Sequence, residues 1–250
     1  MRRFGAMFVT TAAIAGVGYA GYRAMSAPGF LGVLESAEYA TLKAQRTLLS
    51  GQPLAREFSP ADMSPVFKAN GSLMPGGVAY QEYLADDFAS WRLRVDGLVA
   101  NPMRLSLADL KRLPQRTQIT RHDCVEGWSA IGKWSGVPLG HILERAQLAP
   151  NARYVVFHCA DDVYEDGENY YESVDLFDAF HPQTILAHTM NDQPLPVAHG
   201  APLRLRVERQ IGYKQAKYLM RIEVVDRFTH LGQGRGGFWP DRGYEWYAGV

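Results

Sequence analysis

Hydrophobic and polar residues alternate in short runs from about residue 91 onward, a pattern typical of β-strands. Trp91–Val95 alternates clearly, and Asp96-Gly97 then turns the chain. Tyr154–Phe157 is instead continuously apolar, which predicts a buried strand. The same signals predict further strands at Met103–Leu105, Thr117–Arg121, Thr184–Met190, Leu203–Val207 and Tyr218–Val225, with an Asn191-Asp192 turn after Met190.

Short helices are predicted between these strands. Ser106 and Asp109 form a capping-box pattern, and Pro114 ends the helix that it starts. Pro138–Ala146 has proline in its first turn, as many helices do. A third helix is predicted from a Ser173 cap through Phe180, before Pro182. Short strands and helices without a regular βαβ period predict a mixed α+β domain.

The chain divides into four predicted parts. Residues 1–26 have Arg2-Arg3, an uncharged apolar run and then Arg23, which is typical of an export signal or a membrane anchor. Arg2-Arg3 also fits a twin-arginine signal, and the heavier N-terminal charge predicts an exported body. We expect a tether and N-terminal arm over 27–83, the main domain over 84–228, and a tail rich in glycine and aromatic residues over 229–250 that packs on the domain.

Composition narrows the class of function. The 250 residues include 26 Lys+Arg and 26 Asp+Glu, so the formal net charge is zero and nothing favours nucleic-acid binding. The two cysteines, Cys124 and Cys159, could form a disulfide in an exported protein, but spacing alone leaves this open.

The clearest chemical feature is Arg121-His122-Asp123-Cys124-Val125-Glu126-Gly127-Trp128-Ser129. A cation near a cysteine lowers the thiol pKa, and the thiolate binds soft transition metals. Arg121 could play that part, whereas Asp123 and Glu126 would oppose it.

Two further clusters follow predicted strands or begin them. His158-Cys159-Ala160-Asp161-Asp162 ends the buried strand. His199-Gly200-Ala201-Pro202-Leu203-Arg204 and Gly212-Tyr213-Lys214-Gln215-Ala216-Lys217 combine cations with a glycine turn, which suits an anionic group.

Together these motifs resemble the sulfite oxidase family of molybdopterin enzymes. The resemblance covers roughly residues 91–226, and its motifs occur in the same order as in that family. They are Cys124–Ser129 with Lys133–Leu139, His181-Pro182, the run from His199 to Arg204, and the lysine turn. The resemblance implies a sulfite oxidase-like α+β fold with mixed sheets and one molybdenum–molybdopterin, with Cys124 as the protein's metal ligand. By position it implies cofactor contacts from Asn70, Cys159, His199, Arg204, Gln215, Ala216 and Lys217.

The resemblance also suggests the reaction. The Cys-Val-Glu-Gly-Trp-Ser loop is more similar to periplasmic methionine-sulfoxide reductases than to sulfite oxidases, whose cysteine precedes Ala-Gly-Asn-Arg. This implies two-electron oxygen-atom transfer, as reduction of a small-molecule or protein-bound S- or N-oxide. Arg121 and His122 would orient the substrate. No Cys-x-x-Cys-His haem motif is present and the chain ends soon after the domain, so we expect a separate haem protein as electron donor and no immunoglobulin-like domain.

Three alternatives remain open at this point. The family also contains enzymes that oxidise sulfite. A zinc hydrolase could use His122, Cys124, His158 and Cys159, although the adjacent His158 and Cys159 would point to opposite sides of a strand. A membrane-tethered binding module with a Cys124–Cys159 disulfide would need no catalysis.

Overall fold

The computed structural model describes residues 53–250. The predicted signal or anchor and the first part of the tether, residues 1–52, lie outside the described residues. Within residues 53–250, no helix is long and apolar enough to cross a membrane.

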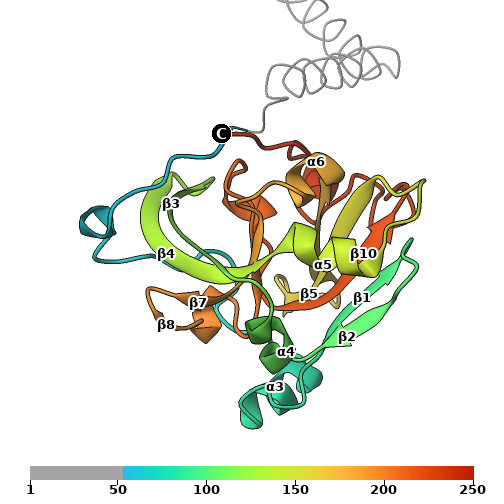
Figure 1. Cartoon of the computed structure of the whole chain (residues 1–250), viewed down its shortest axis with the longest axis horizontal. Helices are drawn as coiled ribbons and strands as arrows, with labels where there is room; N and C mark the ends of the chain where they lie inside the picture. The colour runs from blue at the N-terminus through green and yellow to red at the C-terminus, as the bar shows by residue number, and fades with distance from the viewer. Residues whose placement is uncertain (1–52) are drawn as a thin grey trace, which may run out of the picture. The chain divides into compact units, whose positions relative to one another are not determined.

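One sheet contains five strands in the order β2-β1-β10-β5-β6. The strand β1 runs parallel to β10, and the other neighbours are antiparallel. In Figure 1, β1, β10 and β5 lie on one side of the part of the chain formed by residues 53–250. The strands are β1 (Leu93–Gly97), β2 (Met103–Leu105), β5 (Tyr154–Asp162), β6 (Asn169–Asp175) and β10 (Leu219–Val225).

The second sheet is built on a long hairpin of β3 and β4, which curves strongly in Figure 1. The strand β7 pairs with β4 along one of its edges. Along the other edge of β7, β9 pairs with the first part of the strand and β8 with the last part. The strands are β3 (Arg116–Cys124), β4 (Trp128–Pro138), β7 (Ile185–Met190), β8 (Gln193–Pro194) and β9 (Arg204–Arg206).

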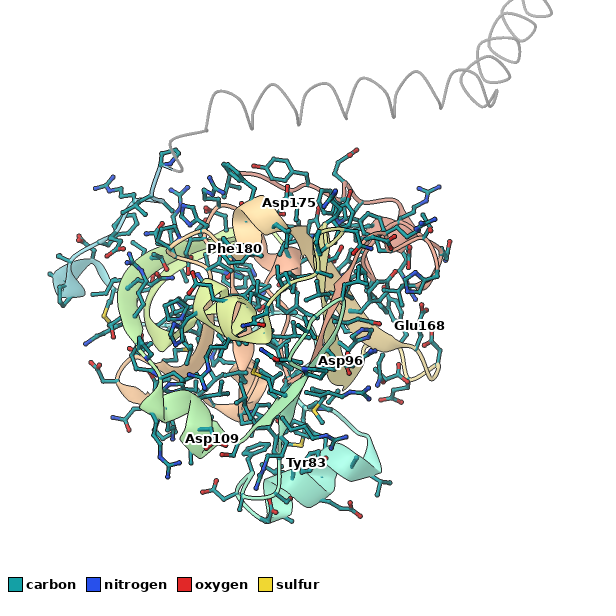
Figure 2. All side chains as sticks on the ribbon, turned by 45° about the vertical axis from the view of Figure 1, so that its right-hand side comes forward. Tyr83, Asp96, Asp109, Glu168, Asp175 and Phe180 are labelled. Atoms are coloured by element: carbon teal, nitrogen blue, oxygen red, sulfur yellow. The ribbon has the colours of Figure 1, made fainter. Side chains whose placement is uncertain are left out.

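The helices are short and lie mainly in connections. Figures 1 and 2 place α3 and α4 at one end of residues 53–250 and α6 at the other, with Tyr83, Asp109 and Asp175 marking them in Figure 2. The α-helices are α3 (Val78–Ala85), α4 (Leu107–Arg112), α5 (Leu139–Ala146) and α6 (Leu176–Ala179). The 3₁₀ turns are η1 (Pro60–Asp62), η2 (Val197–His199), η3 (Gly212–Lys214) and η4 (Pro240–Arg242).

Local chemistry explains two of the helices. The Ser106 hydroxyl accepts a hydrogen bond from the Asp109 backbone N–H at 3.0 Å, which confirms the predicted capping box. In α5 the buried residues are Leu139, Ile142, Leu143 and Ala146, a helical spacing that turns one face inward. Burial of each large side chain contributes roughly 1.5–3 kcal/mol, so this face anchors the helix on the core.

Two predictions about elements were incomplete or wrong. The sequence pattern predicts no strand over residues 128–138, where β4 forms the longest strand of the described residues. Ser173 does not cap a helix, because it lies inside β6. The Asp175 side chain caps α6 instead, accepting from the Asp178 N–H at 2.9 Å.

Two groups of buried side chains fill the interior. The larger one joins α5 to the sheet that contains β5 and β10. The smaller one lies on β4 and β7 around Trp134, with Phe67 of the N-terminal arm packed against it. The tail also returns to the domain, since Phe238 is fully buried in the larger core and Gly237 and Gly249 form bridges with Glu172 and Gln210. Arm and tail thus both reach the region where β3 ends.

Candidate active site

A pocket of about 820 Å³, including its open mouth, lies where segments distant in the sequence meet. Its walls come from the arm, the end of β3, the end of β5, the start of β6, the η3 turn and the tail. The lining residues are Asn70, Gly71, Ser72, Cys124, Val125, Glu126, Asp161, Val163, Tyr170, Gly212, Tyr213, Gln215, Lys217, Trp239 and Tyr244.

The thiol of Cys124 is placed by the β3–β4 hairpin. Cys124 is the last residue of β3, and a three-residue turn leads to Trp128. Gly127 has a φ of +84°, and its N–H donates to the Cys124 carbonyl at 3.0 Å. A left-handed glycine is typical of such hairpin turns. The turn therefore holds a half-buried, free thiol at the pocket wall.

Arg121 is not brought to this pocket. Side chains alternate between the two faces of a strand, so His122 and Cys124 share one face and Arg121 and Asp123 the other. The Arg121 side chain is 56% exposed and forms an ion pair with Asp123 at 2.9 Å. The expected lowering of the thiol pKa by Arg121 is therefore corrected. Burial raises the pKa of Cys124, Glu126 adds to this, and Lys68 opposes it.

His122 lies behind the pocket, fully buried. Its Nδ1 is 3.0 Å from Nη1 of Arg206, whose Nη2 donates to Glu208 at 2.6 Å. Burial, together with Arg206 and Arg204, holds the pKa of His122 well below 6.5, so the ring is neutral. A Cβ on the pocket residue Gly212 would lie 2.7 Å from Nε2 of His122, so only glycine allows this approach. His122 therefore supports the pocket wall from inside.

Arg204 is a buried cation that has no carboxylate partner among residues 53–250. Its Nη1 donates to the His199 carbonyl at 2.9 Å and its Nη2 to the Gln215 carbonyl at 3.3 Å. Its guanidinium lies 5.0 Å from the centre of the Trp134 ring. Burial lowers the pKa of Arg204 to about 9, with Arg206 adding to the effect. An unpaired buried charge is costly, which indicates a site made for an anion.

Lys217 is a second such cation. Its Nζ donates to the carbonyls of Asn70 at 2.7 Å, Ala198 at 3.0 Å and Ser72. Burial lowers its pKa to about 7, and Arg204 contributes. The other lysine of this turn, Lys214, is held away from the pocket by Glu172, 2.6 Å from its Nζ.

Several buried polar atoms near these cations have no partner. Phe67 lies 5.7 Å from both the His122 and the His199 rings and 5.3 Å from Trp134, which shows that these groups are close together. Buried polar groups without a partner are rare in proteins, so their grouping fits a deeply buried polar ligand. The atoms are His122 Nε2, Trp134 Nε1, His199 Nδ1, Arg204 Nε and Gln215 Oε1.

The remaining predicted cofactor residues divide into two groups. Asn70 and Gln215 line the pocket, whereas the buried Cys159 and Ala216 lie outside its lining. His199 is beside Arg204, and burial lowers its pKa to about 4. Cys159 lies on β5 two residues before Asp161, in the larger core.

Some pocket residues were absent from the predicted site. Asp161 was visible as a polar group after a buried strand, and Trp239 and Tyr244 as tail aromatics. Nothing in the local sequence of Ser72 or Tyr170 signals their place in the pocket, whereas Tyr213 lies inside the lysine turn that the sequence had already indicated.

The geometry does not support the zinc or the disulfide alternative. Both cysteines are free thiols. The His158 ring lies 2.9 Å from Glu223, away from Cys159, which is packed in the core. No three His, Cys, Asp or Glu side chains converge as a metal-binding group anywhere in the part of the chain that the structure describes.

Comparison with known proteins gives the family. The profile described as "Oxidoreductase molybdopterin binding domain" matches residues 80–230. A putative protein-methionine-sulfoxide reductase subunit YedZ1 of Azospira oryzae is 40% identical over 198 residues, 77% of this chain and 70% of that protein. The protein-methionine-sulfoxide reductase catalytic subunit MsrP of Xanthomonas campestris is 36% identical over 146 residues.

That match covers 55% of this chain and 45% of MsrP, so the matched region is less than half of that relative. Among solved structures, the sulfane dehydrogenase SoxCD of Paracoccus pantotrophus has a TM-score of 0.49 and 24% identity, over 55% of this chain and 38% of that one. Because the family profile covers more than half of the sequence, this chain belongs to the oxidoreductases with a molybdopterin-binding domain, and molybdenum–molybdopterin is its cofactor.

Proposed function

We propose that this protein reduces a neutral S-oxide, with Cys124 as the protein's ligand to molybdenum. When bound, molybdenum–molybdopterin supplies a two-electron redox centre for oxygen-atom transfer. The observation that carries the proposal is the placement of a free thiol in one pocket with Lys217, beside buried cations that have no carboxylate partner.

The cofactor is held by two buried cations and by the polar groups beside them. Arg204 and Lys217 provide the positive charge for its phosphate, and His199 and Gln215 have unused hydrogen-bonding atoms next to them. All three N–H groups of Lys217 already donate to carbonyls, so it acts on the phosphate through its charge or by exchanging one carbonyl. Asn70 contributes from the arm.

Cys124 binds the metal as thiolate. Its pKa is raised in the protein without cofactor, so the thiol carries a proton that is released on binding. Loading of the cofactor therefore becomes more favourable as pH rises toward the thiol pKa.

The pocket suits an uncharged substrate with an apolar group. No arginine lines it within residues 53–250, and the acidic residue Glu126, which lines it, would repel sulfite. Aromatic side chains form one wall, with Tyr244 5.3 Å from Tyr213 and 5.1 Å from Trp239 between ring centres. Sulfur and apolar groups pack favourably on such rings. Both relatives are named as methionine-sulfoxide reductases, which agrees with this substrate class.

The electron donor is a separate protein in this proposal. The sequence has two cysteines and no haem-attachment motif, so the chain offers no second redox centre of that kind. A haem protein is the class of donor we infer, outside the cytoplasm, where the Arg2-Arg3 apolar segment would deliver or anchor the domain.

The test uses protein purified from a host that makes molybdopterin. We expect near-stoichiometric molybdenum and reduction of methionine sulfoxide and dimethyl sulfoxide with dithionite-reduced viologen. Cys124→Ser should lower turnover by roughly 100-fold or more, the scale of losing an essential group, and should change the molybdenum spectrum. Turnover of an N-oxide alone, or sulfite oxidation without S-oxide reduction, would contradict the proposed substrate class.

A further inference from the structure

Asp161 is a pocket residue with an unusual environment for a carboxyl group. It lies near the end of β5, is 4% exposed and lines the same pocket as Cys124. Its Oδ2 accepts a hydrogen bond from the Ser72 hydroxyl at 2.6 Å. Its Oδ1 is buried and has no hydrogen-bond partner. One oxygen is thus held in place and the other is free to act.

Lys217, whose charge acts on Asp161, forms no hydrogen bond with this carboxyl group. An ammonium group has three N–H donors, and Lys217 gives all three to the carbonyls of Asn70, Ser72 and Ala198. A carboxylate at this position would therefore be a buried charge without a paired cation, which is strongly unfavourable. This environment raises the pKa of Asp161 and so shifts its equilibrium toward the protonated acid.

The other titratable groups around Asp161 add no positive charge. Burial raises the pKa of the surrounding tyrosines and of the Cys159 thiol, so they remain neutral. Asp162 is negative and opposes ionisation of its neighbour. The groups that face Asp161 are Tyr80 from α3, Cys159 and Asp162 on β5, Tyr170 on β6, and Lys217 and Tyr218 after η3.

Reduction of an S-oxide needs protons as well as electrons. One S-oxide takes up two electrons and two protons, the S–O bond breaks, and a sulfide and one water are formed. The electrons would come from a one-electron donor by way of the cofactor, and the protons must reach the inner wall of the pocket, where Asp161 is 4% exposed. A neutral carboxylic acid can supply a proton in such a place.

We propose that Asp161 is the proton donor of this reaction, delivering a proton from Oδ1 to the oxygen that leaves the substrate. The carboxylate then takes up a proton from solvent at the pocket mouth and delivers the second in the same way. Ser72 holds Oδ2, so the free oxygen keeps one orientation. This role rests on the proposed S-oxide reduction.

The sign of the pH dependence follows from the protonated form being active. Burial raises the pKa of Asp161, and the Ser72 hydrogen bond and Lys217 lower it. Turnover should fall as pH rises through this pKa. Ser72→Ala removes a contribution that lowers the pKa, so it should move this alkaline limb to higher pH.

The experiment compares cofactor-loaded wild-type protein with Asp161→Asn and Asp162→Asn. Asp162 is the neighbouring carboxyl on the same strand, outside the pocket lining, and accepts from the backbone N–H of Gly167 at 2.6 Å. General acid catalysis contributes about 10²–10⁴-fold, so Asp161→Asn should lower kcat by at least about 100-fold with unchanged KM. Its molybdenum content should equal that of wild type, and Asp162→Asn should keep wild-type kcat.

A second readout does not depend on turnover. Because burial raises the pKa of Asp161, its infrared carbonyl band of a carboxylic acid should persist to higher pH than the band of an ordinary aspartic acid. The difference between wild type and Asp161→Asn isolates this band from that of Glu172, whose pKa burial raises to about 7.

The outcomes separate this role from the proposed function. An active wild type with an equally active Asp161→Asn, or a missing acid band, overturns the donor role alone. Loss of molybdenum in Asp161→Asn would show that the residue holds the cofactor and would also overturn it. A loaded wild type that reduces no S-oxide removes the proposed function, and the donor role with it.

Discussion

Nη1 of Arg206 lies 3.0 Å from Nδ1 of His122, and this contact fixes how the histidine is protonated. A guanidinium only donates hydrogen bonds, so Nδ1 is the acceptor and the neutral ring carries its proton on Nε2. Arg206 is itself held by Glu208, which also accepts from Gln118 at 2.8 Å. A buried chain of polar groups thus joins the start of β3 to the residue that supports the pocket.

We predict that Arg206→Met destabilises the fold strongly. The side chains of Arg206 and Glu208 are both 0% exposed, so the substitution leaves a buried carboxylate without its cation. Such losses cost about 3–5 kcal/mol. Urea unfolding measures this free energy. The double variant Arg206→Met, Glu208→Gln should recover part of the loss, and recovery of none would show that the pair is not the cause.

Arg204→Met is the matched substitution. We predict that it lowers the molybdenum content more and the unfolding free energy less than Arg206→Met does. Arg204 lies on the same strand, is also fully buried and also lies over Trp134, but it has no carboxylate partner. In cofactor-free protein it should cost less unfolding free energy than Arg206→Met. Its molybdenum content should fall roughly tenfold or more, because a hydrogen bond to a charged group contributes about 1.5–3 kcal/mol. Equal stability losses with full molybdenum would contradict a cofactor role for Arg204.

The β4 strand shows why the fold was predicted only in part. Its inward positions include Ala130, Gly132 and Gly136, so the usual alternation of large apolar residues is missing. Gly136 needs to be small, because a Cβ there would collide with the Leu186 carbonyl of β7, and one on Gly132 would lie 3.0 Å from Phe67. The need for these glycines comes from the neighbouring strand and the arm, which local sequence does not reveal.

The site residues that lie in motifs shared with the family could be predicted from the sequence. The residues that reach the pocket only when distant segments of the chain meet could not. Cys124, Gln215 and Lys217 were placed by resemblance, and they share the pocket. The misplacement of Arg121 could have been avoided, since residues three apart on a strand lie on opposite faces. The aromatic wall could not be inferred, because Tyr213 and Tyr244 approach only when the tail folds back, with the Tyr213 hydroxyl donating to the Glu245 carbonyl at 2.6 Å.

Arg121→Ala is therefore predicted to leave catalysis unchanged. The side chain points away from Cys124 and is bound to Asp123. Steady-state assays with methionine sulfoxide should give wild-type KM and kcat, with wild-type molybdenum content. A rise in KM would show that the arginine reaches the substrate after all, as the sequence alone suggested.

Protonation of His188 should destabilise the folded protein in mild acid. Burial lowers the pKa of His188 from 6.5 to about 4, with Lys111 contributing. Between these values the unfolded chain binds a proton that the folded chain does not, so stability rises with pH there. His188→Gln should make this slope shallower in urea unfolding across pH 4 to 6.5. His122 and His199 contribute in the same direction, whereas Glu172 and Asp161, whose pKa values burial raises, oppose it, so the change in slope on substitution is the test of His188.

Tyr244 offers a test of the aromatic wall in substrate choice. Its ring is 42% exposed, lines the pocket and contacts Tyr213 and Trp239. Aromatic contacts contribute about 0.5–1.5 kcal/mol, so Tyr244→Ala should raise KM for methionine sulfoxide by about three- to tenfold with little change in kcat. Dimethyl sulfoxide, which has less apolar surface to pack, should be affected less.

Tyr164→Ala is the matched control for this prediction. Tyr164 is also an exposed tyrosine in contact with Trp239, 6.4 Å between ring centres, but it does not line the pocket. It should leave both KM values unchanged. If the two variants raised KM equally, the effect would come from a general loosening of the tail. If only Tyr244→Ala does so, and more for the larger S-oxide, then the tail supplies a substrate-selecting surface outside the region, residues 80–230, that the family profile matches.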